Sequence, residues 1–189
     1  MINTLISARK SIRAFDGRTV NDETLANLFE AARWAPSSRN EQPWRFVIVK
    51  KEDSQNFSDL LSCLHPTNQV WAKNASALIL VTVKKTFSGN ETVNAHAYYD
   101  AGQAVANLSL QATADHLYLR QMGGIDKDKI ITVFNVPPGF GIVCVIAAGY
   151  PGNPASLPDY LSEKENLPRT RKATDEFVFS GKFGKKIAA

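Results

Sequence analysis

The sequence predicts a single domain in which a β-sheet is covered on both faces by α-helices. Segments with helical spacing of apolar residues alternate along the chain with short apolar runs that are typical of strands. The length of 189 residues suits one domain with a buried core. Hydrophobic residues make up 44% of the chain and charged residues 21%, as expected of a folded globular protein rather than a disordered one.

The first half of the chain is predicted to contain helices separated by two strands. A short amphipathic helix is expected over residues 2–9. A second helix begins after its N-cap Asn21 and is ended by Pro36, because a proline disfavours helix at the residue before it. Asp53 is the expected cap of a further helix that carries apolar residues as far as Leu64. The apolar runs at 44–49 and 77–83 are the expected strands.

The second half is predicted to begin with a long helix over about residues 95–116. One of its faces carries Ala101, Val105, Leu108 and Ala112, and its other faces are also rich in small residues. Such a helix has to be covered on several sides, so we expect it to be central or to pack against a partner chain. The remaining expected elements are a strand over 117–122, a helix capped by Asp126, and a strand over 141–149.

The segment from Pro151 onward differs from the rest of the chain. It contains four prolines and many charges but few apolar residues, so we expect no core of its own and contact with its own body or with a neighbouring subunit. No repeat or linker divides the chain. The prediction is therefore one domain over 1–189, with 151–189 as an extended tail.

Charge and cysteine usage exclude several classes of function. The net charge of +4 is concentrated near the two ends of the chain, which suits a small phosphate if the ends meet, but no basic stripe for nucleic acid is visible. The longest nearly apolar run, 142–149, is too short to cross a membrane, and residues 1–4 do not resemble a secretory signal, so we expect a cytoplasmic protein. Cys63 and Cys144 lack metal-ligand spacing and are expected to be core residues, with no metal site.

Polar residues gather in four short segments that are candidates for ligand binding. Taken one at a time, each segment has a simpler interpretation. In chain order these are a helix end complemented by cations, a solvated loop, a glycine turn and a basic tail. The alternative is phosphate binding at the basic segments, hydrogen bonding by the polar loop, and close approach of a flat ligand to the paired glycines. The segments are 9–13, 35–46, 121–124 and 168–172.

In this order and spacing the chain resembles the FMN-dependent nitroreductase family, over nearly its whole length. The resemblance implies an α+β fold, a three-layer sandwich whose central, mostly antiparallel sheet is flanked by helices. It also implies an intertwined, obligate homodimer in which the long helices pack together and the tail embraces the partner. The matching motifs are Arg9-x-Ser11-x-Arg13, Pro36-Ser37-Ser38-x-Asn40-x-Gln42-Pro43-Trp44, Gly123-Gly124 and Ala148-Gly149-Tyr150-Pro151.

The resemblance also implies roles for individual residues around FMN. Arg9 and Ser11 would bind the phosphate together with Arg169 and Arg171, and Arg13 would face the pyrimidine edge of the flavin, where negative charge accumulates on reduction. The backbone N–H of Gly123 would address flavin N5. Further cofactor contacts would come from the partner's copies of Pro36, Ser37, Ser38 and Asn40, and from Asn68, with Lys10, Gln42, Met122 and Gly124 in the matching segments.

One departure from the family pattern concerns the flavin contact at position 71. A lysine is often found three residues after the asparagine that matches Asn68, and this chain has Trp71 there. The contact is therefore expected to be missing or replaced by stacking. The chain is also short, so the helical insertion that shapes the substrate pocket of larger relatives is expected to be absent.

The implied activity is transfer of hydride from NADH or NADPH through FMN to an electron-poor acceptor such as a nitroaromatic compound or a quinone. The flavin carries the chemistry, so no residue is predicted to be a catalytic acid or base. Two alternatives stay open. One is another flavin reaction on the same scaffold, such as reductive dehalogenation, and the other is a flavin-binding or storage protein without turnover.

Overall fold

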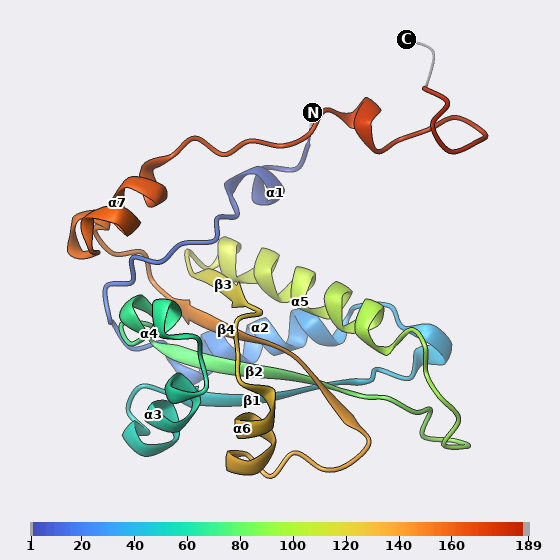
Figure 1. Cartoon of the computed structure of the whole chain (residues 1–189), viewed down its shortest axis with the longest axis horizontal. Helices are drawn as coiled ribbons and strands as arrows, with labels where there is room; N and C mark the ends of the chain where they lie inside the picture. Colours follow the sequence, from blue (N-terminus) through green and yellow to red (C-terminus); the bar gives the residue numbers. More distant parts are fainter. Residues whose placement is uncertain (1, 187–189) are drawn as a thin grey trace.

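An antiparallel sheet forms the middle layer of the protein (Figure 1). A computed structural model describes residues 2–186. The strands lie side by side in the order β1-β2-β4-β3, and each neighbouring pair is antiparallel, as predicted. The strands are β1 (Trp44–Lys50), β2 (Ala77–Lys84), β3 (Tyr118–Met122) and β4 (Phe140–Gly149).

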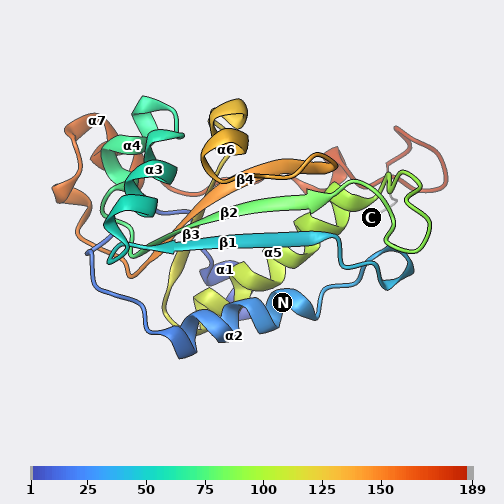
Figure 2. The ribbon, with the colours of Figure 1, turned by 90° about the horizontal axis from the view of Figure 1, so that it is seen from below.

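Helices cover both faces of this sheet (Figure 2). α2 (Asp22–Arg33) and α5 (Ala97–Ala114) lie on one face, and α3 (Ser54–Ser62), α4 (Pro66–Ala72) and α6 (Lys127–Val133) lie on the other. The short helix α1 (Thr4–Ala8) lies outside the sheet near the end of α5. The three layers match the α+β architecture implied by the sequence.

The alternation of side chains along β2 divides the core into two halves. Ile79 packs among residues of α2 and α5, whereas Leu78 and Leu80 pack among residues of α3, α4 and α6. The side chains of β2 from Ala77 to Val83 are all buried. This burial on both faces explains why the strand is a continuous apolar run rather than an alternating one.

The predicted helix caps are present in the structure. Asn21, Asp53 and Asp126 each accept a hydrogen bond from the backbone N–H three residues further on, at 2.7, 3.4 and 3.0 Å. The prediction that the helix after Asp53 continues to Leu64 is wrong, because α3 ends at Ser62 and Leu64 pairs with Ile125 in an isolated β-bridge. A separate helix, α4, then begins at Pro66 and was not predicted.

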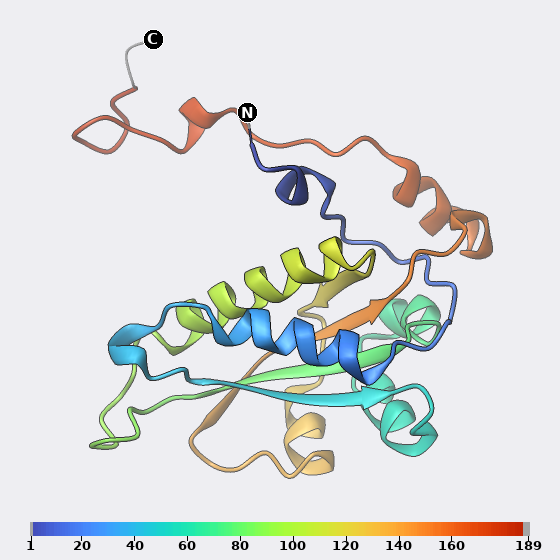
Figure 3. The same ribbon diagram turned by 180° about the vertical axis from the view of Figure 1, so that it is seen from behind.

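The segment after β4 packs on its own chain for part of its length. It contains a helix that was not predicted, α7 (Asp159–Asn166), and Leu157 and Leu161 are buried in the core on the α3 and α4 side of the sheet. Residues 2–14 and the segment after α7 then run near each other along the outside of the molecule (Figure 3). From residue 167 to 186 the side chains are exposed or half-buried.

Candidate functional site

Segments near the two ends of the chain meet, which is the condition under which their charges could bind a small phosphate. Arg169 donates hydrogen bonds to the backbone carbonyl oxygens of Ser7 at 2.5 Å and Arg9 at 2.6 Å, at the C-terminal end of α1. Residues 10–13 and 164–169 line a hollow of about 500 Å³ between the two segments. Arg171 is not part of this contact, since its guanidinium donates to the carbonyl of Thr170. Lys10, Ser11 and Arg169 therefore line one polar hollow, and Arg169 contacts the backbone of Arg9 next to it.

Arg13 lies in the same hollow and is held by a carboxylate that the sequence did not reveal. The backbone N–H of Arg13 donates to Oε1 of Glu165 at 2.5 Å, and its guanidinium Nη1 lies 3.1 Å from Oε2. The Glu165 side chain is only 8% exposed and that of Arg13 20%. Glu165 belongs to α7, so this helix fixes the position of Arg13.

A further cation, Arg120, reaches the same segment from the edge strand β3. Its Nη1 donates to the backbone oxygen of Ser11 at 2.6 Å. Sequence reasoning missed this residue, although the alternation within β3 contained a signal: Arg120 lies on the same side of the strand as Met122, which is 3% exposed. A charged residue on the buried side of a strand calls for a specific partner.

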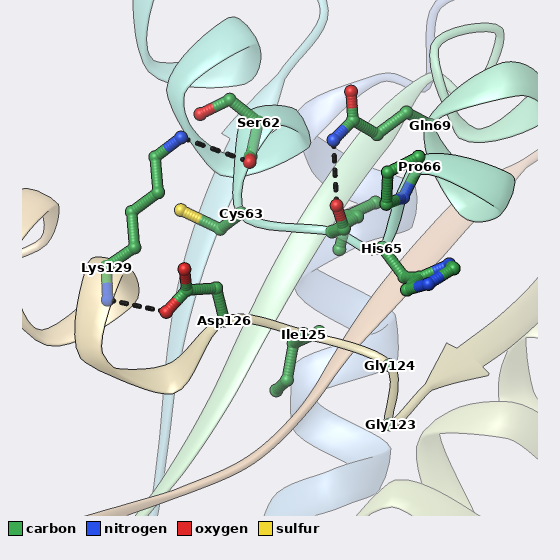
Figure 4. Close-up of a pocket in the computed structure, with 11 residues that line it drawn as sticks. Ser62, Cys63, His65, Pro66, Gln69, Gly123, Gly124, Ile125, Asp126 and Lys129 are labelled. Carbon is green, nitrogen blue, oxygen red and sulfur yellow. Dashed lines mark hydrogen bonds between the residues drawn. The ribbon is translucent and has the colours of Figure 1, made fainter.

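The paired glycines border a second hollow of about 490 Å³, between the turn from α3 to α4 and the loop from β3 to α6 (Figure 4). The backbone N–H of His65 donates to the carbonyl of Gly124 at 2.9 Å, which ties the two loops together. A Cβ atom on Gly123 would meet no atom within 4 Å, whereas one on Gly124 would lie 3.5 Å from Nδ2 of Asn68. Gly123, Gly124 and Asn68 are thus neighbours, with open space beside Gly123.

Two residues of the predicted set have side chains that face the core. The Met122 side chain is buried, so that residue offers only its backbone to a ligand. Trp71 is 1% exposed and packs 6.2 Å from the ring of Phe15. Stacking of Trp71 on a flavin, one of the two outcomes expected for this position, is therefore wrong, because no ring face is open to a ligand.

His65, which is not among the predicted site residues, also lines the second hollow. It is the N-cap of α4, and its Nδ1 lies 2.9 Å from Oγ1 of Thr67. Lys129 borders the same hollow and donates to the carbonyl of Ser62 at 3.1 Å. Both contacts position loop backbone, so they account for these two side chains without a ligand.

The loop over 36–42 does not meet the other predicted site residues within one chain. It lines a separate hollow at the N-terminal end of α5, where the N–H of Ser38 donates to the buried carboxylate of Asp100 at 3.0 Å. Figure 1 shows this loop at the far end of α5 from β3. A single chain thus separates Pro36, Ser37, Ser38, Asn40 and Gln42 from the Arg9 and Gly123 segments.

Internal hydrogen bonds shape this loop. Ser37 Oγ accepts the N–H of Gln42 at 2.9 Å, and the side-chain amide of Gln42 donates to Oδ1 of Asn40 at 3.1 Å. Arg39, Asn40 and Gln42 all have φ between 50° and 55°, in the left-handed region that non-glycine residues rarely adopt. Backbone strain of this kind is common at functional sites, where neighbouring contacts hold it in place.

The two cysteines are buried thiols, as predicted. Burial raises the pKa of Cys144 to about 11, and it also raises the pKa of Cys63 above its ordinary value. Neither thiol is a nucleophile near neutral pH. Within residues 2–186 there is no group of three His, Cys, Asp or Glu side chains suited to a metal ion, and no helix is both long and apolar enough to span a membrane.

The arrangement of charges fits a phosphorylated ligand with an anionic ring edge. Four cations from both ends of the chain line the hollow at residues 10–13, and a fifth, from β3, hydrogen-bonds Ser11 beside it. Among residues 2–186, only Arg13 of these five pairs with a carboxylate. A surplus of cations at a partly buried site favours an anion such as a phosphate group. The four that line it are Lys10, Arg13, Lys164 and Arg169, and the fifth is Arg120.

Fold and site together define an α+β protein with a cation-lined hollow built from segments near both chain ends. The nitroreductase family model matches residues 6–150, and the chain belongs to that family. The solved structure of an oxidoreductase containing FMN superposes with a TM-score of 0.92 at 37% identity, covering 98% of this chain and 94% of that one.

Curated relatives are similar over most of the chain. An uncharacterised 15.4 kDa protein of Mycolicibacterium smegmatis is 32% identical over 133 residues, 70% of this chain and 88% of the relative. A protein of Archaeoglobus fulgidus with a provisional NADH dehydrogenase/NAD(P)H nitroreductase name is 27% identical over 156 residues, 78% of this chain and 83% of the relative.

Proposed function

We propose that the protein is an FMN-dependent oxidoreductase that works as a homodimer and uses NADH or NADPH as its electron donor. The observation that carries the proposal is the surplus of cations where the chain ends meet, with Arg169 bonded to the carbonyl of Arg9. FMN combines a phosphate with a ring edge that becomes negative on reduction, so it needs cations at both places. The FMN named for the solved structure described above supports the same cofactor.

The residues of this chain fit the parts of FMN. Arg9, Ser11 and Arg169 are the expected phosphate ligands, with Arg171 able to join them once a phosphate attracts it. Arg13, fixed by Glu165, is the expected cation at the pyrimidine edge. The open space beside Gly123 would let a flat ring approach the backbone, with Asn68 next to it.

Bound FMN would supply the redox chemistry by taking a hydride from NADH or NADPH and passing two electrons to an electron-poor acceptor, such as a nitroaromatic compound or a quinone. The chain would hold the cofactor, keep a cation at the ring edge that gains negative charge, and limit access of water. For a quinone acceptor, the hydride and one proton from water give the hydroquinone, while the nicotinamide is oxidised.

A second copy of the chain would complete the site. The loop over 36–42 lies too far along the molecule to reach its own Gly123 segment, but in a symmetric dimer it would enter the site of the partner. α5 supports this arrangement, because its outward side carries Gly102 and Ala106, small exposed residues that allow two helices to approach closely. The tail over 167–186 would then cover the partner.

Spectroscopy of the purified protein tests the proposal. The holoprotein should be yellow, should be bleached by NADH or NADPH without oxygen, and should regain its colour on addition of a quinone or nitroaromatic compound. A yellow protein that neither nicotinamide bleaches would instead be a flavin-binding protein without turnover. A bleached protein that only a halogenated compound reoxidises would be a dehalogenase. A protein that cannot be loaded with FMN contradicts all three.

A further inference from the structure

Arg120 is a half-buried cation held against a rigid aromatic surface. It extends from the edge strand β3, and its guanidinium carbon lies 5.3 Å above the ring centre of Trp71. Trp71 is fully packed in the core, so its ring cannot move away. Arginine stacks on tryptophan through its planar guanidinium while its edge keeps its hydrogen-bond donors. The contact with Trp71 and the hydrogen bond to Ser11 therefore hold the guanidinium of Arg120 in place.

Most of these N–H groups have no acceptor in the part of the protein that the structure describes and keep contact with solvent, where a ligand can reach them. Nη1 donates to the backbone oxygen of Ser11 at 2.6 Å and lies 3.3 Å from its Oγ. Within residues 2–186, Nε and Nη2 make no hydrogen bond to the protein. A guanidinium carries five donors, and leaving several unpaired at a half-buried position costs free energy unless water or a ligand accepts them.

The charges around Arg120 also lack balance. Its pKa is lowered first by burial and then by the positive charge of Arg13, and only Glu165 opposes the shift. Arg120 nevertheless stays a cation, because arginine ionises far above neutral pH. The cluster of Arg13, Arg120 and Glu165 thus has two positive charges and one negative charge. A bound anion would remove the repulsion between the two guanidinium groups.

We propose that Arg120 is a second fixed cation of the flavin site, which acts with Arg13 on the negative charge that FMN gains at its pyrimidine edge. The proposal rests on the FMN-dependent function proposed above. It also gives Trp71 a role. The tryptophan does not contact the flavin, but it supports Arg120, which does. The cation comes from β3, whereas Arg13 comes from the N-terminal segment.

The test compares three variants of the FMN-loaded protein. Arg120→Gln removes the charge and keeps a polar side chain, and Arg120→Lys keeps the charge. Arg18→Gln is the control, because Arg18 also stacks on an aromatic ring, 4.3 Å from the centre of Tyr150, but its side chain is 65% exposed. For each, we would measure the midpoint potential of bound FMN, the Kd values for FMN and riboflavin, and the thermal midpoint.

In Arg120→Gln, the ratio of the affinity for reduced FMN to that for oxidised FMN should fall about tenfold. This change makes the midpoint potential about 30 mV more negative. Arg120→Lys should recover most of that shift, and Arg18→Gln should not move the potential. Riboflavin lacks the phosphate but has the same ring. The affinity of the protein for reduced riboflavin should therefore fall in Arg120→Gln as much as its affinity for reduced FMN.

Two results would overturn the inference. One is an unchanged potential in a folded, FMN-loaded Arg120→Gln protein, which would make Arg120 a support for Ser11 only. The other is weaker binding of FMN but not of riboflavin, which would place Arg120 at the phosphate. If instead the wild-type protein binds no FMN, the proposed function itself is wrong, and the inference about Arg120 is wrong with it.

Discussion

Arg13 and Glu165 are joined twice across 152 positions of sequence, once through the backbone N–H of Arg13 and once through its guanidinium. The second contact is an ion pair of 3.1 Å whose carboxylate is almost fully buried. The Glu165 side chain therefore links helix α7 to the N-terminal segment, next to the packing of Leu161, and also supplies a negative charge to the site. Any change at Glu165 should affect both the attachment of α7 and the electrostatics around Arg13.

We predict that Glu165→Gln lowers the free energy of unfolding by about 2 kcal/mol. Breaking a buried ion pair costs more than this, but Arg13 keeps some solvent contact and glutamine retains an acceptor for its N–H. In the FMN-loaded protein the midpoint potential should become more positive, because a negative charge is removed beside the ring edge. This sign is opposite to that expected for Arg120→Gln.

Urea unfolding and a spectroscopic redox titration check these two effects. Glu163→Gln is the matched control, since Glu163 lies two residues earlier on α7 with an exposed side chain. It should alter neither quantity. A Glu165→Gln protein as stable as the control would show that the ion pair does not hold α7 to the N-terminal segment.

The double variant Arg169→Ala, Arg171→Ala should bind FMN at least tenfold more weakly. A charge-assisted hydrogen bond to phosphate contributes about 1.5–3 kcal/mol, and Arg169 also anchors the tail to the carbonyls of Ser7 and Arg9. Affinity for riboflavin, which has no phosphate, should change much less. Fluorescence titration with both flavins measures this difference.

Lys182→Ala with Lys185→Ala removes the same amount of charge from the same tail and is the control. It should bind FMN like the wild type, because neither lysine belongs to the hollow at residues 10–13. Equal loss of FMN affinity in both double variants would mean that the tail acts through its overall charge and not through the contact of Arg169.

The fold could be predicted well where local rules decide it. Asn21 and Asp126 are caps because their short side chains reach the N–H three residues on, and that geometry depends on nothing distant. α7 was missed because its eight residues are strongly polar, and only Leu161 is buried. Its stability comes from packing and from the pairing of Glu165 with Arg13, which depends on tertiary structure.

The same difference applies to the site: residues in short motifs could be predicted, and residues placed by tertiary contacts could not. Arg9, Ser11, Gly123 and Arg169 were predicted from the resemblance to the family, and the structure adds the contact that joins Arg169 to Arg9. Glu165 and Arg120 belong to no motif. Their roles depend on which strand and helix face the N-terminal segment, which a sequence without the fold does not specify. The two outcomes expected at Trp71 could not be separated for the same reason, since its burial follows from the position of α4 against the sheet.

Above pH 9 the protein should lose stability through Cys144. Its pKa is about 11 in the folded protein against an ordinary value near 9, so in this window the unfolded chain releases a proton that the folded chain retains. The unfolded state binds fewer protons there, and the free energy of unfolding falls as pH rises, by up to about 1.4 kcal/mol per pH unit. Below pH 9 both states hold the proton and the contribution is constant.

Cys144→Ala separates this effect from tyrosine and lysine titration in the same range. The difference in unfolding free energy between wild type and variant should narrow from pH 9 to pH 11 and stay constant from pH 6 to pH 8. In parallel, the thiol should react with a disulfide reagent at pH 8 only after unfolding. Rapid modification of native protein at Cys144 would contradict the burial that raises its pKa.

The proposed homodimer makes a prediction about Trp34, which ends α2 with 74% of its side chain exposed. It borders an apolar hollow together with Leu5 and Leu110, from α1 and α5. An exposed tryptophan beside apolar neighbours is typical of the centre of an interface. Trp34→Glu should therefore halve the mass of the particle in solution at micromolar concentration, as measured by light scattering or sedimentation.

Ile131→Glu is the control for Trp34→Glu. Ile131 is a 43% exposed apolar residue on α6, which covers the other face of the sheet, so its replacement should leave the mass unchanged. Because a subunit separated from an obligate dimer can unfold, the wild type offers an independent measurement: its thermal midpoint should rise with protein concentration. A monomeric wild-type mass, with a midpoint independent of concentration and FMN still bound, would show that the loop over 36–42 is not supplied by a partner.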